Sequence, residues 1–302
     1  MPSIFGKKIV CVHSGAFHPD DVTAVAIIEL FLGTPVKVFR SRDPQIWAKS
    51  DYVFDVGGVY DPARGRFDHH QPEFAEKRAN GIGYSSAGLA WKHFGEKVAG
   101  SHDVWQRIDE KIIQPLDAED NGMNIYQPVI PGIAPYMLGD FLFAFNPSHH
   151  EKTNPDEAFL QAVEQSKQML SREIRRITDR LADAEAVKNI YEKTADKRVI
   201  ILNEHYSWRK TLAAFPEPFF VISPRPDTGT WGVETVDDTA GDKFARRLLF
   251  PESWAGKRDA ELAQVTGVPD ATFCHRGCFI AGARSKEGAM KLAALALTAA
   301  NK

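Results

Sequence analysis

The stretch from Pro155 to about Ala195 contains no glycine and no proline after its first position. Its apolar residues recur at helical spacing, so it predicts one long connecting helix, continuous or broken once. Such a helix divides the chain of 302 residues into two parts, each long enough to form a domain. We place the boundary within or just after the helix and predict domains at residues 1–195 and 196–302.

Short apolar runs alternate with helical patterns in the N-terminal part. Strands are expected within residues 7–15, 36–41 and 51–58, and helices within residues 20–33, 85–95 and 101–122. A short polar segment between the second and third strands is compatible with another helix. This alternation predicts a parallel sheet covered by helices, and therefore an α/β domain.

A second series of strands and helices follows the long helix. Strands are expected within residues 198–203, 218–225, 230–236, 271–275 and 278–284, and helices within residues 259–267 and 285–300. We predict a smaller C-terminal α/β domain.

The composition is that of a globular protein, with 43% hydrophobic and 25% charged residues. A formal net charge of −3 provides no global field that would attract nucleic acid or an anionic membrane. No leader pattern or bilayer-spanning apolar run is visible, so a cytoplasmic location and no membrane partner are expected. An odd number of cysteines argues against a disulfide framework, and Cys274 and Cys278 are interpreted as reduced packing residues.

Acids and imidazoles concentrate in four segments of the N-terminal part that follow expected strands or enter loops. Ligands of open α/β sheets bind beyond the carboxyl ends of the strands, where these segments are expected. The candidate side chains are His13, His18, Asp20, Asp21, Asp55, Asp68, His69, His70, Asp117 and Asp120.

Two divalent ions need a bridging carboxylate and several terminal ligands, and this set contains enough of both. Imidazoles and carboxylates without thiolates favour manganese, with magnesium as the alternative. Each residue also has a simpler interpretation: Asp55 as a turn residue, Asp20 or Asp21 as a helix N-cap, Asp120 as a solvated loop acid. The joint pattern favours a dinuclear site.

These segments, in this order, resemble the DHH phosphoesterase superfamily, and within it the melanocyte-proliferating-gene family of metal-dependent hydrolases. The resemblance covers nearly the whole chain. Its most specific part is "DVGGVYDPARGRFDHHQ" at residues 55–71, together with "HSGAFHPDD" at residues 13–21 and "DAEDNG" at residues 117–122. Further matching segments are "SRDP", "SSAGLAWKHFG", "FNP", "SW" and "GVPDATFCHRGCFIAGARSKEGA".

The resemblance implies roles for residues of the N-terminal part. One metal would be held by His13 and His18, the other by Asp20, His69 and Asp120, with Asp55 as the bridging carboxylate. His70 would contact the scissile phosphate and Asp68 would orient its neighbours. The first motif reads H-x-x-x-x-H-x-D where the superfamily has H-x-x-x-D-x-D, which leaves the individual roles of His18, Asp20 and Asp21 open.

In the superfamily the C-terminal domain binds substrate, and "HRGCFIAGAR" resembles its histidine-containing segment without the usual run of glycines. Guanidinium groups bind phosphate oxygens bidentately, although Arg284 has an equally simple interpretation as a strand-end residue. The candidate substrate-binding residues are Arg209, Lys210, Arg225, His275, Arg276 and Arg284.

The function expected from this resemblance is that of a manganese-dependent phosphoesterase. Its substrate would be RNA or a short oligonucleotide, degraded from the 3′ to the 5′ end by two-metal hydrolysis. Two alternatives stay open: a small-molecule phosphoesterase or pyrophosphatase, and a non-catalytic binding module stabilised by metal. Assembly as a homo-oligomer is compatible with the sequence.

Overall fold

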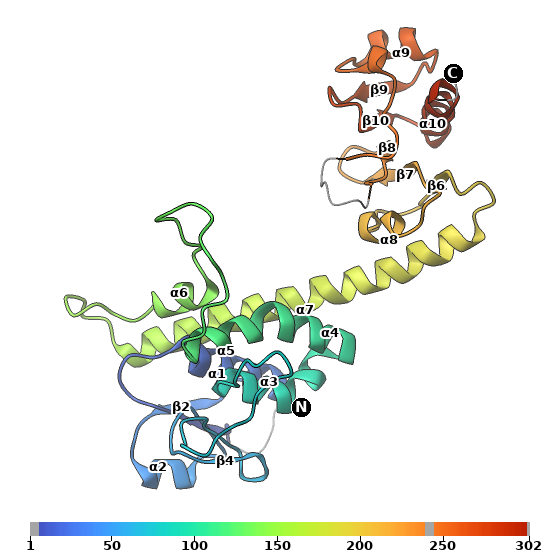
Figure 1. Cartoon of the computed structure of the whole chain (residues 1–302). Helices are drawn as coiled ribbons and strands as arrows, with labels where there is room; N and C mark the ends of the chain where they lie inside the picture. The colour runs from blue at the N-terminus through green and yellow to red at the C-terminus, as the bar shows by residue number, and fades with distance from the viewer. Residues whose placement is uncertain (1–5, 239–244, 301–302) are drawn as a thin grey trace. The chain divides into compact units, whose positions relative to one another are not determined.

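The computed structural model describes residues 6–238 and 245–300. The chain divides into two compact units, residues 1–177 and 178–302 (Figure 1). The division falls within a single helix, α7 (Pro155–Lys193), which has 39 residues. The boundary expected near residue 195 lies just after the end of this helix. Each unit contains one five-stranded sheet, and the predicted α/β class is confirmed.

The sheet of the first unit has the order β2-β1-β3-β5-β4. Four strands are parallel, and β4 joins β5 in antiparallel orientation at one edge. The parallel core agrees with the expected alternation of strands and helices. The strands are β1 (Ile9–Val12), β2 (Lys37–Arg40), β3 (Tyr52–Phe54), β4 (Tyr60–Asp61) and β5 (Arg66–Phe67).

Helices cover both faces of this sheet. Figure 1 shows α1 and α3 on one side and α2 on the other, where Ile46 and Trp47 of α2 pack on Cys11 and Val53. Helix α1 begins with a proline in its first turn and ends at Gly33, whose positive φ stops the helix. The helices are α1 (Pro19–Leu32), α2 (Pro44–Lys49), α3 (Ser86–Ala99), α4 (His102–Ile108), α5 (Gln114–Asp120), α6 (Leu138–Phe143), the 3₁₀ turn η1 (Pro62–Arg64) and the π-helical turn η2 (Asp109–Ile113).

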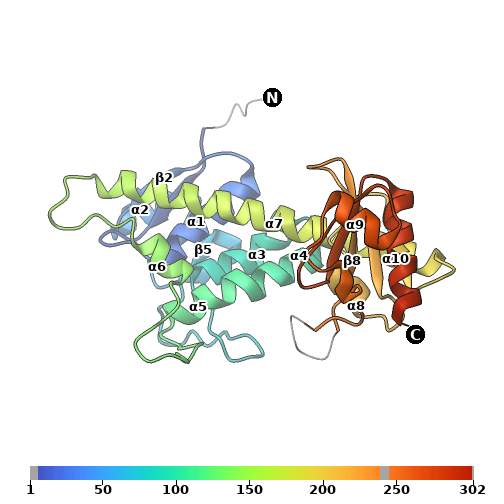
Figure 2. The same ribbon diagram turned by 90° about the horizontal axis from the view of Figure 1, so that it is seen from above.

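The sheet of the second unit has the order β6-β7-β8-β10-β9. Only β6 and β7 are parallel, and the other neighbours are antiparallel. Alternate residues of β7 face opposite sides: Phe220 and Ile222 pack in the core that contains α10, whereas Val221 packs against Trp208 and the end of α7. The view in Figure 2 shows α10 beside this sheet. The elements are β6 (Val199–Ile201), β7 (Phe220–Arg225), β8 (Thr230–Thr235), β9 (Ala271–Cys274), β10 (Ile280–Ala283), α8 (Arg209–Ala213), η3 (Glu252–Trp254), α9 (Asp259–Thr266) and α10 (Lys286–Ala300).

Two observations bear on the environment of the protein. Within the described ranges, no helix combines the length and the apolar character needed to cross a bilayer. All three cysteines are free and buried, which agrees with the packing role predicted for Cys274 and Cys278.

Candidate metal centre

The carboxyl ends of three neighbouring parallel strands bring acids and imidazoles to one edge of the first sheet. His13 follows β1, Asp55 follows β3, and Asp68–His70 follow β5. Because β1, β3 and β5 are adjacent and parallel, their ends lie side by side. This adjacency explains why residues so far apart in the sequence form one cluster.

Two helix ends complete the cluster. The N-terminus of α1 supplies His18, Asp20 and Asp21, and α5 ends at Asp120. His18 occupies the N-cap position of α1, so neither acid takes the N-cap role that the sequence left open. Both acids lie in the first helical turn and are almost completely buried.

Asp55 lies between the two histidines that the sequence assigned to different metals. Its Oδ2 is 3.3 Å from His13 Nε2, and its Oδ1 is 3.3 Å from His69 Nε2. His69 Nε2 is also 3.2 Å from Asp120 Oδ2. A carboxylate that presents one oxygen to each side has the geometry of a bridging ligand. Asp55 also has a positive φ of 56°, a conformation that is uncommon outside glycine and is enriched at functional sites.

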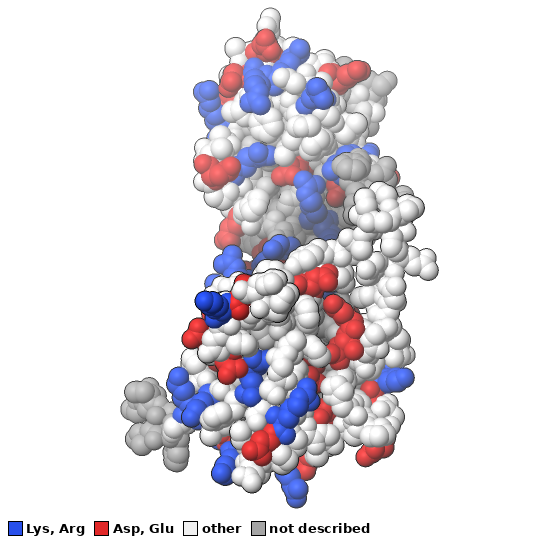
Figure 3. Space-filling view, turned by 90° about the vertical axis from the view of Figure 1, so that its left-hand side faces the viewer, with Lys and Arg blue, Asp and Glu red and all other residues white. Residues whose placement is uncertain are grey.

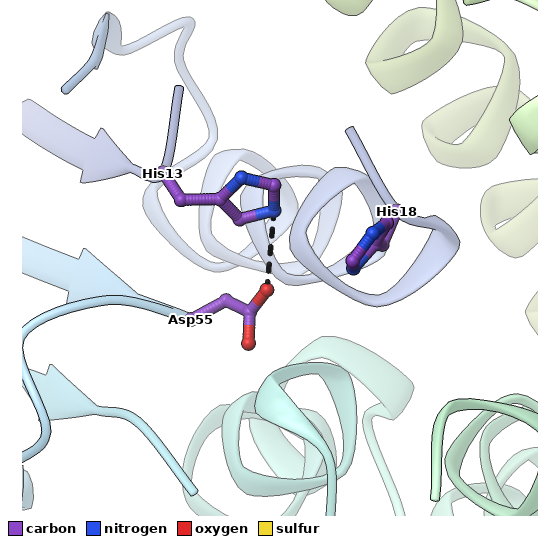
Figure 4. Close-up of side chains that lie close together, drawn as sticks. All are labelled: His13, His18 and Asp55. Carbon is purple, nitrogen blue, oxygen red and sulfur yellow. Dashed lines mark ion pairs between the residues drawn. The ribbon is translucent and has the colours of Figure 1, made fainter. Parts of the chain in front are cut away.

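Among the described residues, three groups of side chains have ligand atoms close enough together to hold an ion. Figure 4 shows the first, in which His13 and Asp55 point toward each other with the ring of His18 beside them. His18 and Asp55 each belong to two of the groups, so the groups are linked. They are His13, His18 and Asp55; Asp55, His69 and His70; and His18, Asp20 and Asp120.

Buried polar atoms without partners test whether these residues fit a metal. Among the described residues, eight buried side-chain nitrogen or oxygen atoms lack a hydrogen-bond partner, and five of them belong to this cluster. Buried polar groups normally have partners, so a concentration of unpaired atoms at one place indicates a site for a ligand. The five atoms are His13 Nε2, Asp20 Oδ1, Asp21 Oδ2, Asp55 Oδ1 and His69 Nε2. The donor set therefore fits divalent cations.

Asp55 is the carboxylate that stays ionised most readily. Burial opposes its ionisation, but the imidazoles of His13 and His69 next to it outweigh burial and lower its pKa. The central position of an ionised carboxylate suits a bridging ligand.

Asp20, Asp21 and Asp120 lack sufficient positive charge around them. Burial, and then the charge of Asp55, raises the pKa of Asp20, and burial followed by the charge of Asp20 raises the pKa of Asp21. Burial and Asp20 raise the pKa of Asp120 to about 8. Bound cations would remove this penalty, since they favour the ionised forms.

Neighbouring groups hold the ligands in place. Asp68 Oδ2 accepts a hydrogen bond of 2.6 Å from the Gly58 amide, and its Oδ1 accepts one of 2.8 Å from His70 Nδ1. The bond to Asp68 raises the pKa of His70 to about 9, although burial acts against it. The His70 side chain is 61% exposed, so its ring is accessible.

Sequence reasoning missed the contacts of Asp20, Asp21 and Asp117. Ser86, at the start of α3, donates to Asp20 Oδ2 from its hydroxyl at 2.8 Å, and Asp21 Oδ2 lies 3.2 Å from His13 Nε2. Asp117 Oδ1 accepts from the Gly88 amide at 3.0 Å, and a Cβ at this glycine would lie 2.1 Å from the carboxylate. Asp117 thus joins α5 to α3. The available signal for these contacts was the pair Ser85 and Ser86 at the start of an expected helix, since both hydroxyls donate to buried carboxylates.

The six candidate substrate-binding residues all belong to the second unit, where they form two groups. Ile280 pairs with Glu234 at the end of the sheet where His275 and Arg276 follow β9, and Arg209 bonds to Glu234 there. At the opposite end of the sheet, Ala283 pairs with Trp231. Arg284 follows Ala283 and Arg225 pairs with Thr230, so both arginines lie at this end. The first group is Arg209, Lys210, His275 and Arg276, and the second is Arg225 and Arg284.

Comparison with known proteins identifies the family. Residues 9–297 match MYG1_exonuc, described as "Uncharacterised protein family (UPF0160)". The chain is 30% identical to the MYG1 protein of Dictyostelium discoideum, with 94% of each protein covered. It is 29% identical to a MYG1 protein of Schizosaccharomyces pombe, over 95% of this chain and 97% of that protein. Its identity to the human MYG1 exonuclease is 28%, over 93% of this chain and 83% of that protein. The chain therefore belongs to the MYG1 family.

Proposed function

We propose that this protein is a metal-dependent phosphodiesterase that removes mononucleotides from the 3′ ends of RNA or short oligonucleotides. The observation that carries the proposal is the position of Asp55, with one oxygen toward His13 and the other toward His69. The name of the human relative, an exonuclease, supports the same reaction class.

Two ions, manganese in our proposal and magnesium as the alternative, would be shared among the cluster residues. His13 and His18 would hold one, Asp20, His69 and Asp120 the other, and Asp55 both. When bound, such ions polarise the phosphate, activate water as the nucleophile and stabilise developing negative charge. The unpaired buried atoms and the linked ligand groups support a metal centre at these residues, and His18 is also close enough to Asp20 and Asp120 to share an ion with them.

His70 would bind the scissile phosphate. Its Nδ1 donates to Asp68, which leaves Nε2 on an exposed ring. A cationic imidazole donates a charge-assisted hydrogen bond to a phosphate oxygen, stronger than a neutral one. Asp68 would act through His70 by fixing the ring orientation and keeping it protonated.

The second unit would bind the remainder of the substrate. His275, Arg276, Arg209 and Lys210 gather at one end of its sheet, and we assign substrate binding to this group first. Arg225 and Arg284 would contact another phosphate of the substrate. The free, buried cysteines support a cytoplasmic setting, where thiols remain reduced.

A small-molecule phosphoesterase or pyrophosphatase is the second candidate. The face shown in Figure 3 carries basic and acidic side chains interspersed, without a broad basic patch. Arg209 is also paired with Glu234 and Asp237. Long RNA usually requires a basic surface, so these features favour short substrates.

The test compares pyrophosphate, a dinucleotide and a longer 3′-labelled RNA with added manganese. Release of mononucleotides from 3′ ends supports the proposal, whereas turnover of pyrophosphate alone selects the second candidate. Two bound metal equivalents without hydrolysis of any phosphoester would indicate the non-catalytic binding module.

A further inference from the structure

A pocket of about 570 Å³ opens beside the metal centre, and part of its lining consists of residues that the proposed function does not use. Its lining includes metal-centre residues, among them His13, Asp55 and His70. The lining also includes Arg42, Trp47 and Gly57. A volume of this size lies within the range of pockets that bury a small-molecule ligand.

The backbone fixes Arg42 close to the metal centre. Arg42 follows β2, the neighbour of β1, so it lies at the same sheet edge as His13. The amide of Ser41 donates to the carbonyl of Val12 at 2.8 Å, which joins the residue before Arg42 to the residue before His13. The location of Arg42 is therefore set by the strand register.

The guanidinium of Arg42 is available for an external ligand. Arg42 is exposed, and no hydrogen bond or ion pair joins it to another residue in the described part of the chain. Two neighbouring arginines are engaged by the protein: Arg40 with Asp156, and Arg66 with the carbonyls of Trp47 and Ser50. Arg42 is also the only lysine or arginine that lines the pocket, among the residues described. An arginine in this position suits an anionic group, above all phosphate.

Trp47 provides a firm apolar surface in the same lining. Its Nε1 donates to the Ser41 carbonyl at 3.0 Å, and its ring packs on Cys11 and Val56. A Cβ at Gly57 would lie 3.4 Å from the indole, and the φ of this residue is +99°. Glycine thus permits the backbone turn and leaves no side chain against this part of the ring. Indole rings stack with nucleobases irrespective of sequence.

We propose that Arg42 and Trp47 form a subsite for one nucleoside monophosphate unit, with the phosphate on Arg42 and the base against Trp47. The inference rests on the proposed function. It specifies which part of the substrate would bind to the first unit. A subsite of this size would admit a single terminal nucleotide, which would favour cleavage at chain ends. It would also bind a mononucleotide product.

The experiment measures binding of AMP to the manganese-loaded, full-length protein by calorimetry, with adenosine and inorganic phosphate as partial ligands. Arg42→Gln should weaken AMP binding about 10- to 100-fold, because a charged hydrogen-bonded contact is lost. Lys49→Gln is the matched control: it removes one positive charge from exposed Lys49 of α2, outside the pocket lining, and should change affinity less than about twofold. Trp47→Phe should abolish the change in tryptophan fluorescence that AMP produces in the wild type.

The outcomes separate the subsite from the catalytic proposal. Equal AMP affinity in the wild type and Arg42→Gln, or no binding of millimolar AMP to the wild type, overturns the subsite. AMP binding that depends on Arg42, without hydrolysis of any dinucleotide, supports the subsite and contradicts the proposed reaction. Dinucleotide hydrolysis with an unchanged KM in Arg42→Gln supports the reaction and contradicts the subsite.

Discussion

At one sheet edge of the first unit, buried acids and imidazoles gather without enough partners, whereas acids of the second unit such as Asp270 and Asp237 are paired. In the second unit Asp270 accepts two hydrogen bonds from Ser285, and Asp237 pairs with Arg209 and Arg246. In the part of this unit that is described, Arg225 Nε is the one buried side-chain polar atom without a partner. An excess of unpaired ligand atoms distinguishes a site built for an external cation from polar groups that stabilise the fold.

The largest effect is expected from Asp55→Asn. Asparagine has the same shape and also tolerates positive φ, so the variant should fold, while the loss of the bridging charge should reduce phosphodiester hydrolysis by about 10³-fold. Initial rates with manganese and circular dichroism test this. Asp103→Asn, on the exposed surface of α4, is the matched control and should retain full activity. If Asp55→Asn hydrolysed phosphodiesters at the wild-type rate, the unpaired ligand atoms of the first unit would not mark a catalytic cation site, and the contrast with the second unit would fail.

Asp117→Asn tests a buried carboxylate that is already paired. Asp117 accepts from Ser85 and Arg78, so the substitution should lower the free energy of unfolding by about 3 kcal/mol at pH 7, measured in urea. The equivalent change at the less buried Asp270 should cost about 1 kcal/mol. A larger loss of stability at Asp270 than at Asp117 would contradict the prediction that the more buried carboxylate contributes more.

The difference in stability between the wild type and Asp117→Asn should also depend on pH. Burial raises the folded-state pKa of Asp117 to about 6, although Arg78 lowers it, against a usual value of 3.8. Between these values the folded protein binds a proton that the unfolded chain does not, so the wild type gains stability relative to Asp117→Asn as the pH falls from 7 to 5. The difference in free energy of unfolding between the two proteins should increase by about 1 kcal/mol. A difference that decreases over this range would contradict the assignment.

Asp21→Asn should stabilise the metal-free protein by roughly 1 kcal/mol. Asp21 is fully buried beside Asp20, and its amide analogue can still accept the 3.1 Å bond from the His18 amide. Removing one crowded carboxylate relieves repulsion that only cations would otherwise offset. Thermal unfolding in EDTA measures the change, and a lower Tm in the variant would show that Asp21 has no unmet electrostatic cost.

The smallest effect is expected in the second unit, on binding of single-stranded RNA. Lys210 has no hydrogen bond or ion pair among the described residues, whereas Arg209 is bound to Glu234 and Asp237. Lys210→Gln should weaken binding a few-fold and reduce the slope of log K against log salt by about 0.7. Arg209→Gln should have less effect. Fluorescence anisotropy at several salt concentrations tests the order, and the reverse order would assign the phosphate contact to Arg209.

The sequence predicts β1 to β3, the strands of the second unit, the long helix and the set of acids at the first sheet edge, because apolar periodicity and strand-to-loop transitions are local signals. It misses β4 and β5, which have only two residues each. It does not distinguish His18, Asp20 and Asp21, since their roles depend on which side each presents in one helical turn. Arg42 carries no local signal either. Its position follows from the pairing of β2 with β1, a contact between distant residues.

The second unit shows a further limit of local signals. Its strand positions follow from the sequence, but the antiparallel order of β7, β8, β10 and β9 depends on pairing across the sheet. That order places His275 and Arg284 at opposite ends of one hairpin. Their proximity within one short motif therefore does not make them a single phosphate site.

Anomalous diffraction at the manganese edge, from crystals grown with the metal, tests the central claim most directly. We expect two peaks about 3.5–4 Å apart, with Asp55 between them and His13 and His69 on opposite sides. A single peak, or peaks away from Asp55, would contradict it.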